Sequence, residues 1–88
     1  MLSQLVKILN PTGLDVKPAG ILCKEAMKFK SEVTYRYGKD NIANAKSVLS
    51  VLGSSVKHGE EILLMCEGVD EEEALAHLIA CFEQGLED

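Results

Sequence analysis

The sequence contains no tryptophan and only two tyrosines and two phenylalanines, so aromatic side chains cannot supply most of a hydrophobic core. It also lacks an apolar run long enough to cross a membrane, which argues against a transmembrane segment. The N-terminus has neither the charged start nor the apolar stretch of a secretory signal peptide. We therefore expect a cytoplasmic protein whose core is mainly aliphatic.

Cysteines and histidines are few, and they form no metal-binding motif. Cys23, Cys66 and Cys81 are odd in number, contain no C-x-x-C pair and lie far apart in the sequence. We expect them to be reduced and to serve as small apolar residues. His58 falls in a loop and His77 on the polar side of a helix, so both are expected to be ordinary surface residues. The sequence thus predicts neither a metal site nor a cofactor.

Acidic residues outnumber basic residues by 14 to 9, which gives a net charge of −5. This balance disfavours nucleic acid as the main partner, because phosphate binding needs a basic face. Several lysines nevertheless fall early in the chain, while acidic residues dominate after residue 59, so a small basic patch is compatible with the acidic total. The length of 88 residues and the apolar content of 47% predict one folded domain over residues 1–88.

Hydrophobic periodicity predicts seven elements in the order β-α-β-β-α-β-α. Strands are expected at residues 2–9, 32–37, 41–43 and 61–66, and helices at residues 16–29, 47–53 and 70–85. Four strands with short connections form an antiparallel sheet, and the two longer helices must bury their apolar stripes on one face of it. The predicted fold class is α+β, an open-faced β-sandwich with helices packed on one face of a four-stranded antiparallel sheet.

Capping residues define the predicted helix starts. Pro18 is acceptable only in a first turn, which places the start of the first helix at Asp15 or Val16. Ser47 and Asp70 are the predicted N-caps of the second and third helices, and Gly53 is the predicted end of the second.

The order of elements, the length and the stretch PTGLDVKPA at the first helix start resemble the HPr family, the histidine-containing phosphocarrier proteins of the bacterial sugar phosphotransferase system. The resemblance covers essentially the whole chain. It implies the fold predicted above and a bacterial protein that is not an enzyme. It is carried by Thr12, Gly13, Leu14, Pro18, Ala19, Leu22, Ala26, Phe29, the segment 44–47, Gly85 and Leu86.

In that family a histidine at the first helix start receives a phosphoryl group from enzyme I, and a neighbouring arginine adds positive charge. The resemblance puts Asp15 at the histidine position and Lys17 at the arginine position. Asp15 has three interpretations: a helix N-cap, a fixed charge that partly imitates the phosphorylated state, or a carboxylate that is itself phosphorylated. The last is disfavoured, because the carboxylate repels the incoming phosphate and a lysine grips a phosphoryl group less well than an arginine.

A second site is implied at Ser47. In one branch of the family, an ATP-dependent kinase phosphorylates a serine at the start of the short second helix, and the product acts with a transcription regulator in carbon catabolite regulation. The stretch NAKSVLSVLG resembles the pattern around that serine. Some members of that branch have lost the histidine and keep only the serine. An N-cap role for Ser47 is compatible with phosphorylation.

The resemblance also implies a partner surface around the two helix starts. Besides Asp15 and Lys17, this surface comprises Gly20, Lys24, Val48, Leu49 and Leu52. Val48 and Leu52 can alternatively cover the core. Gly20 is smaller than the threonine usual in the family, and Ser54 is polar where an apolar residue is common. We expect both differences to change how strongly partners bind.

A further expectation concerns the face of the sheet that carries no helix. Val6, Ile8, Ile62, Leu64 and Cys66 are predicted to point inward, so their neighbours in sequence point to the open face. If the first and last strands are adjacent, the outward residues form a contiguous apolar patch that suits a homodimer or another partner. Scattered surface hydrophobic residues are the alternative. The patch would comprise Leu5, Leu9, Leu63 and Met65.

The function implied by these observations is regulatory. The chain is expected to be an HPr-like protein without the phosphocarrier histidine that binds protein partners and is switched at Ser47. One alternative is a phosphocarrier that uses Asp15, and another is an interaction module that uses the apolar sheet face. Expected partners are an HPr kinase, a transcription regulator or phosphotransferase components, with no direct nucleic-acid or membrane partner.

Overall fold

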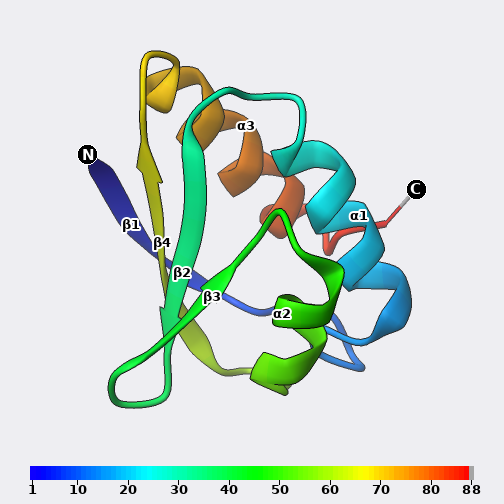
Figure 1. Ribbon diagram of the computed structural model, residues 1–88. Coiled ribbons are helices and arrows are strands. Elements are labelled where there is room, and N and C mark those ends of the chain that lie inside the picture. The colour runs from blue at the N-terminus through cyan, green and yellow to red at the C-terminus, as the bar shows by residue number, and fades with distance from the viewer. Residues whose placement is uncertain (88) are drawn as a thin grey trace.

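A computed structural model describes residues 1–87 and contains the seven expected elements in the expected order (Figure 1). The α+β fold class predicted from the sequence is confirmed. No helix within these residues is long and apolar enough to cross a membrane. The elements are β1 (Leu2–Lys7), α1 (Val16–Ala26), β2 (Glu32–Tyr37), β3 (Asn41–Asn44), α2 (Val48–Ser54), β4 (Glu61–Glu67) and α3 (Glu71–Glu83).

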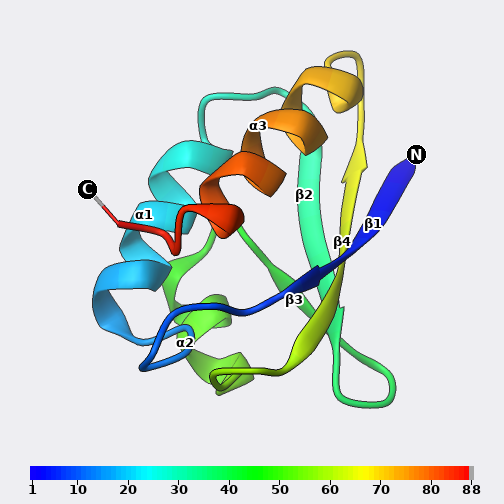
Figure 2. The same ribbon diagram turned by 180° about the vertical axis from the view of Figure 1, so that it is seen from behind.

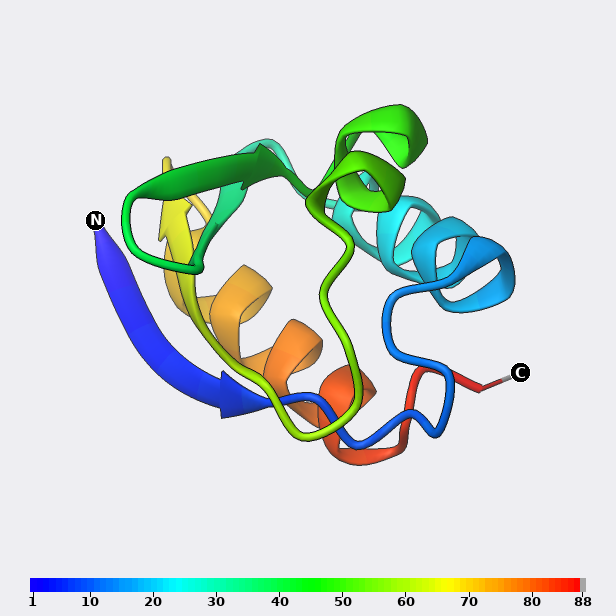
Figure 3. The ribbon, with the colours of Figure 1, turned by 90° about the horizontal axis from the view of Figure 1, so that it is seen from below.

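The four strands form one antiparallel sheet in the order β1-β4-β2-β3. The helices lie on one side of this sheet and leave the other side open, as the two opposite views and the view from below agree (Figures 1, 2 and 3). β4 is therefore a central strand, with β1 and β2 as its neighbours.

The core lies between the sheet and the two longer helices. Its largest fully buried side chains are mostly aliphatic, as expected, with Tyr35 and Phe82 as its aromatic members. The predicted inward residues of β1 and β4, and Ile8 just beyond β1, are all buried. Burying an aliphatic side chain of this size stabilises the fold by about 1.5–3 kcal/mol each.

Several element ends differ from the sequence prediction. α1 ends at Ala26 rather than Phe29, because Lys28 and Phe29 donate to carbonyls only three residues back and so form a tighter turn. β1 ends at Lys7 rather than Leu9, although Ile8 still exchanges backbone hydrogen bonds with Glu60 and Gly59. β3 and β4 are each one residue longer than predicted.

The end of α2 also differs from the prediction. The helix continues past Gly53 to Ser54, and Ser55 ends it in the left-handed region at φ +52°. A serine at that φ is unusual, since the left-handed region normally favours glycine.

Asp70 is the N-cap residue of α3, as predicted, but its side chain acts elsewhere. The Asp70 carboxylate makes no capping bond to α3 and instead accepts the N–H groups of Lys30 and Ser31, both at 2.9 Å, and the Ser31 hydroxyl. These bonds, led by the one from the Ser31 hydroxyl, lower the pKa of Asp70 from 3.8 to about 2. The carboxylate therefore ties the start of α3 to the loop between α1 and β2. Gly68 permits this approach, because a Cβ there would lie 2.6 Å from Ser31 Cα.

The expected apolar patch on the open sheet face is only partly present. Leu5 and Leu63 are direct cross-strand partners, and Leu5 is 59% exposed. Met65, however, is buried, because β4 is central and its neighbours Ser3 and Thr34 flank it on both sides. Leu9 lies beyond the end of β1, where it lines a hollow with Ile79 of α3. Met65 therefore does not belong to an exposed patch, whereas Leu5 and Leu9 line the same hollow.

Two glycines should respond oppositely to alanine substitution. Gly20 lies inside α1, and no atom lies within 4 Å of the position that a Cβ would occupy, so Gly20→Ala should raise the free energy of unfolding by about 0.5–1 kcal/mol through helix propensity. Gly13 has φ +71°, and a Cβ there would lie 2.4 Å from the Val56 carbonyl oxygen, so Gly13→Ala should lower it. Urea unfolding of both variants measures these changes in the free energy of unfolding. A Gly13→Ala variant that is more stable than the wild type would contradict the expected clash with Val56.

Asp70 should shape the acid stability of the fold. Its folded pKa of about 2 lies below the ordinary 3.8, so its stabilisation is complete above about pH 4 and is lost as the pH falls through about 2. Asp70→Asn should therefore be less stable than the wild type at neutral pH, and the difference should shrink in acid. Urea unfolding across this pH range measures it. The control is Glu72→Gln in the first turn of α3, because Glu72 is exposed and takes part in none of these hydrogen bonds. It should leave the dependence of stability on acid pH nearly unchanged.

Candidate functional site

The loop before α1 is held by the loop after α2. The Leu14 N–H donates to the Val56 carbonyl at 2.9 Å, and Gly13 lies so close to Val56 and Lys57 that no side chain fits there. This backbone contact fixes the start of α1 beside the end of α2.

Asp15 is the N-cap of α1, as the sequence predicted. Its backbone is extended, with φ −83° and ψ −173°, and its Oδ1 accepts the Val16 N–H at 2.8 Å. Its backbone carbonyl accepts the Ala19 N–H at 2.8 Å. Pro18, which is buried in the first turn, has no N–H to offer. The carboxylate is exposed and already uses one of the few donors at this helix start.

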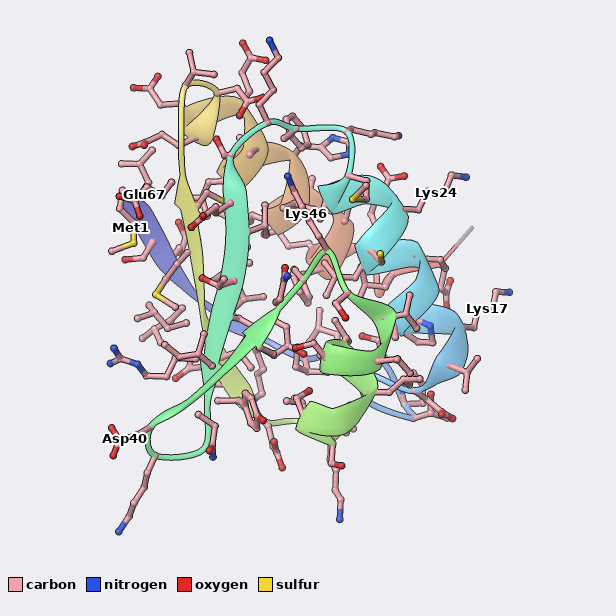
Figure 4. All side chains as sticks on the ribbon, in the orientation of Figure 1. Met1, Lys17, Lys24, Asp40, Lys46 and Glu67 are labelled. Carbon is pink, nitrogen blue, oxygen red and sulfur yellow. The ribbon has the colours of Figure 1, made fainter. Side chains whose placement is uncertain are left out.

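The two lysines of the predicted surface do not converge on Asp15. Lys17 and Lys24 are both exposed and extend from α1 away from the body of the protein (Figure 4). The Lys17 side chain is thus directed into solvent, and it does not form a clamp over the helix start.

Asp15 lies at a shallow hollow of about 240 Å³ that sequence reasoning did not identify. The hollow combines the loop before α1 with the end of α2 and the residues that follow it. Ser55, with its left-handed backbone, and Lys57 bring a hydroxyl and a positive charge to its wall. No sequence motif marks these two residues, because the contacts of Gly13 and Leu14 with Val56 and Lys57 bring them there. The lining residues are Thr12, Leu14, Asp15, Leu52, Ser55, Val56 and Lys57.

Ser47 is the N-cap of α2, as predicted. Its hydroxyl oxygen accepts the Ser50 N–H at 3.2 Å, and its carbonyl accepts the Val51 N–H at 3.0 Å. The side chain is half-buried. Because Asp15 borders the other end of α2, the two predicted sites are separated by this seven-residue helix, a length of about 10 Å at 1.5 Å per residue.

The predicted partner residues differ in how much of them reaches solvent. Leu49 is 82% exposed, while Val48 and Leu52 are half-buried and pack against the core. At Gly20 no atom lies within 4 Å of the position that a Cβ would occupy, so this part of α1 has open space beside it. Leu49 is therefore the apolar side chain on α2 that is most available for contact.

The structure places Ser54 in the interior rather than on the partner surface. Ser54 is buried, and its hydroxyl donates to the Val51 carbonyl and lies 2.8 Å from the Tyr35 hydroxyl. Burial raises the pKa of Tyr35, so its phenol stays protonated and pairs with Ser54. The buried hydroxyl on α2 is therefore paired with a hydroxyl on the sheet.

His77 is also not the isolated surface residue that the sequence suggested. Its Nε2 lies 2.6 Å from Glu25 Oε1, and its ring packs 5.4 Å from that of Phe29. Cys81, one turn further along α3, lies beside the same carboxylate. His58 is exposed and lies 3.1 Å from the Asn10 carbonyl. All three cysteines are free thiols, as expected.

Comparisons with known proteins identify relatives over nearly the whole chain. The family model described as "PTS HPr component phosphorylation site" matches residues 2–84. The phosphocarrier protein HPr of Mycoplasma genitalium is 39% identical over 77 residues, covering 88% of each chain. The HPr-like protein Crh of Bacillus subtilis is 34% identical over 84 residues, covering 96% of this chain and 98% of its own.

Solved structures agree with the sequence comparisons. HPr-C-His from Thermoanaerobacter tengcongensis has a TM-score of 0.93 at 32% identity, covering 100% of this chain and 99% of its own. A structure described as an HPr dimer from the same organism has a TM-score of 0.77 at 32% identity, covering 100% of both chains.

Proposed function

Because this chain belongs to the HPr family, we propose that it is a regulatory member that carries Asp15 in place of the phosphocarrier histidine and is phosphorylated at Ser47. HPr and Crh are phosphocarrier and regulatory proteins, so the chain is not an enzyme. We further propose that residues 1–88 act as one domain in the cytoplasm of a bacterium. Its partners would be an HPr kinase, a transcription regulator or components of the phosphotransferase system.

The observation that carries the proposal is the state of the first helix start. A carboxylate occupies it and accepts the Val16 N–H, while the two histidines, His58 and His77, contact the Asn10 carbonyl and Glu25. A phosphoryl group arriving there would meet a negative charge, a proline without an N–H, and a lysine that points into solvent. These features argue against a relay through Asp15 and favour a capping role with a permanent negative charge.

Ser47 is the better candidate for phosphate. It is partly exposed, and its oxygen accepts a hydrogen bond from Ser50, so its own hydroxyl proton is not committed to that bond. Leu49 next to it is an exposed apolar contact that a partner can use together with the phosphate. A phosphoserine adds about 1.5–2 negative charges at neutral pH, enough to change which partner binds this surface.

Phosphorylation in vitro tests this assignment. With ATP and an HPr kinase from a related bacterium, we expect the wild type to gain one phosphate and Ser47→Ala to gain none, by intact-protein mass spectrometry. Ser50→Ala is the matched control: it lies on the same turn, bonds the Asn44 N–H, and should still be phosphorylated. With phosphoenolpyruvate and enzyme I, neither protein should be labelled. An acid- and hydroxylamine-sensitive phosphate that disappears in Asp15→Asn would replace the proposal with a carrier function.

A second candidate function is self-association through the open sheet face. Leu5 and Leu63 face each other on this side, and the same row continues through Arg36 to Ile42, which is 58% exposed. An edge strand with exposed leucine, such as β1, favours pairing with another chain. The dimeric HPr of Thermoanaerobacter tengcongensis supports a homodimer in this family.

Substitution of two exposed leucines, Leu5 and Leu49, distinguishes the role of the sheet face from that of the helix surface. Leu5→Lys should shift the sedimentation mass of the protein toward the monomer and leave phosphorylation of Ser47 unchanged. Leu49→Lys, at the even more exposed α2 position, should leave the mass unchanged and weaken partner or kinase binding by about tenfold, the effect of about 1.4 kcal/mol of lost contact. A wild type that sediments as a monomer at high concentration would remove the homodimer.

A further inference from the structure

Outside the helix starts and the sheet face, one cluster joins three chemically different side chains. Glu25 near the end of α1 meets His77 and Cys81 of α3, at a hollow of about 580 Å³ between the two helices. His77 and Cys81 are four residues apart and therefore lie on the same face of α3. None of the three has a role in the function proposed above.

The geometry of the cluster is compact. One ligand atom from each residue lies within 4.8 Å of the other two. Glu25 Oε1 is 2.6 Å from His77 Nε2 and 4.0 Å from Cys81 Sγ. The Glu25 side chain is 16% exposed and that of His77 is 40% exposed, so the cluster is sheltered from solvent yet open to it.

We propose that Glu25, His77 and Cys81 form a three-ligand site for a divalent transition metal ion of the zinc class. Imidazole nitrogen, thiolate sulfur and carboxylate oxygen are the donors that Zn²⁺ uses, with bond lengths of about 2.0–2.3 Å. A metal at the centre of the cluster replaces the hydrogen bond between Glu25 and His77, and small rotations bring the three atoms to one coordination sphere. The fourth position faces the hollow and is open to water or to a ligand from a partner.

The charges around the cluster are consistent with this assignment. The Glu25 carboxylate is ionised, because hydrogen bonds first from Lys28 and then from His77 lower its pKa. Burial, and then the Glu25 charge, raise the pKa of Cys81, so the thiol is protonated until a cation arrives. Binding therefore breaks the S–H bond and releases that proton to solvent, and the imidazole gives up its Nε2 proton or carries it on Nδ1.

Lys28 opposes the metal. Its Nζ lies 2.9 Å from the same Glu25 oxygen, so the ammonium and the metal compete for it. Lys24 and Glu87 also border the hollow and contribute opposite charges. Removing the Lys28 charge should therefore strengthen metal binding, whereas removing the charge of Lys17, which lies outside the hollow, should not, as it would if the metal only adsorbed to the acidic surface.

A nucleophilic role for Cys81 fits the geometry less well. In a cysteine–histidine pair the imidazole must take the thiol proton, and a carboxylate must hold the other ring nitrogen. Here the His77 Nε2 and the Cys81 thiol both contact the same oxygen of Glu25. The thiol faces the Glu25 carboxylate rather than the imidazole, so a shared cation explains the convergence of the three side chains better than catalysis does.

Cobalt titration of the reduced protein tests the site. We expect one Co²⁺ per chain, a thiolate-to-cobalt charge-transfer band and visible bands of tetrahedral intensity, all displaced by Zn²⁺. Cys81→Ser should lose the charge-transfer band, and His77→Gln and Glu25→Gln should each weaken binding by about tenfold or more. Cys23→Ser is the matched control, because this thiol is equally half-buried but donates to the Lys46 carbonyl, and it should bind as the wild type does.

Two further results decide between this site and adventitious binding. Lys28→Gln should bind Co²⁺ several-fold more tightly than the wild type. Zn²⁺ should raise the unfolding temperature of the wild type and of Cys23→Ser but not of Cys81→Ser or His77→Gln, with circular dichroism verifying that each is folded. Absence of the band in the folded wild type, or equal affinities in all variants, would overturn the proposal. Neither result depends on Ser47 phosphorylation.

Discussion

The contact between the backbone of Gly13–Leu14 and that of Val56–Lys57 is the constraint on which the helix-start surface depends. It joins a loop that follows the first strand to a loop that precedes the last, two segments more than forty residues apart in the chain. With a side chain at residue 13 the two loops would separate, and Asp15 would no longer border the end of α2. The hollow that contains Asp15, Ser55 and Lys57 follows from this one close approach.

A second close approach holds the opposite end of the molecule. There Gly68 lies against Ser31, and the Asp70 carboxylate gathers two backbone N–H groups and a hydroxyl from the loop that follows α1. Both clamps use a glycine with positive φ to bring a loop of the helix layer against a loop at an end of β4. The central strand thus fixes both ends of the helix layer, and the buried aliphatic residues between them complete the fold.

The sequence predicted the fold well because its evidence is local and repetitive. Alternating residues in EVTYRY, the helical spacing of Ala19, Leu22 and Ala26, and the caps Asp15 and Ser47 each indicate an element without knowledge of the others. What it missed depends on contacts across the chain. The Asp70 carboxylate does not cap α3 because it bonds Ser31, 39 residues earlier in the chain. The Ser54 hydroxyl is buried because it pairs with the Tyr35 hydroxyl of the sheet.

The cluster around Glu25 escaped prediction for the same reason. Short Cys and His spacings do not include a carboxylate 52 residues away from its histidine partner, as Glu25 is from His77. The one local signal was the pair His77 and Cys81, four residues apart and hence on one helix face. Met65 shows the converse error, because the alternation that turns it outward does not reveal that β4 is central and that its neighbours cover the side chain.

These constraints explain how the scaffold of a phosphocarrier can carry different chemistry at its helix start. The fold requires a glycine at residue 13, a buried proline at residue 18 and a residue at position 15 that can cap α1. Asp15 satisfies that last requirement through its hydrogen bond to the Val16 N–H. The chemistry of residue 15 is therefore separable from the fold, whereas Gly13 is not. Family membership fixes the scaffold of such a protein, and the function has to be argued from the side chains that the scaffold presents.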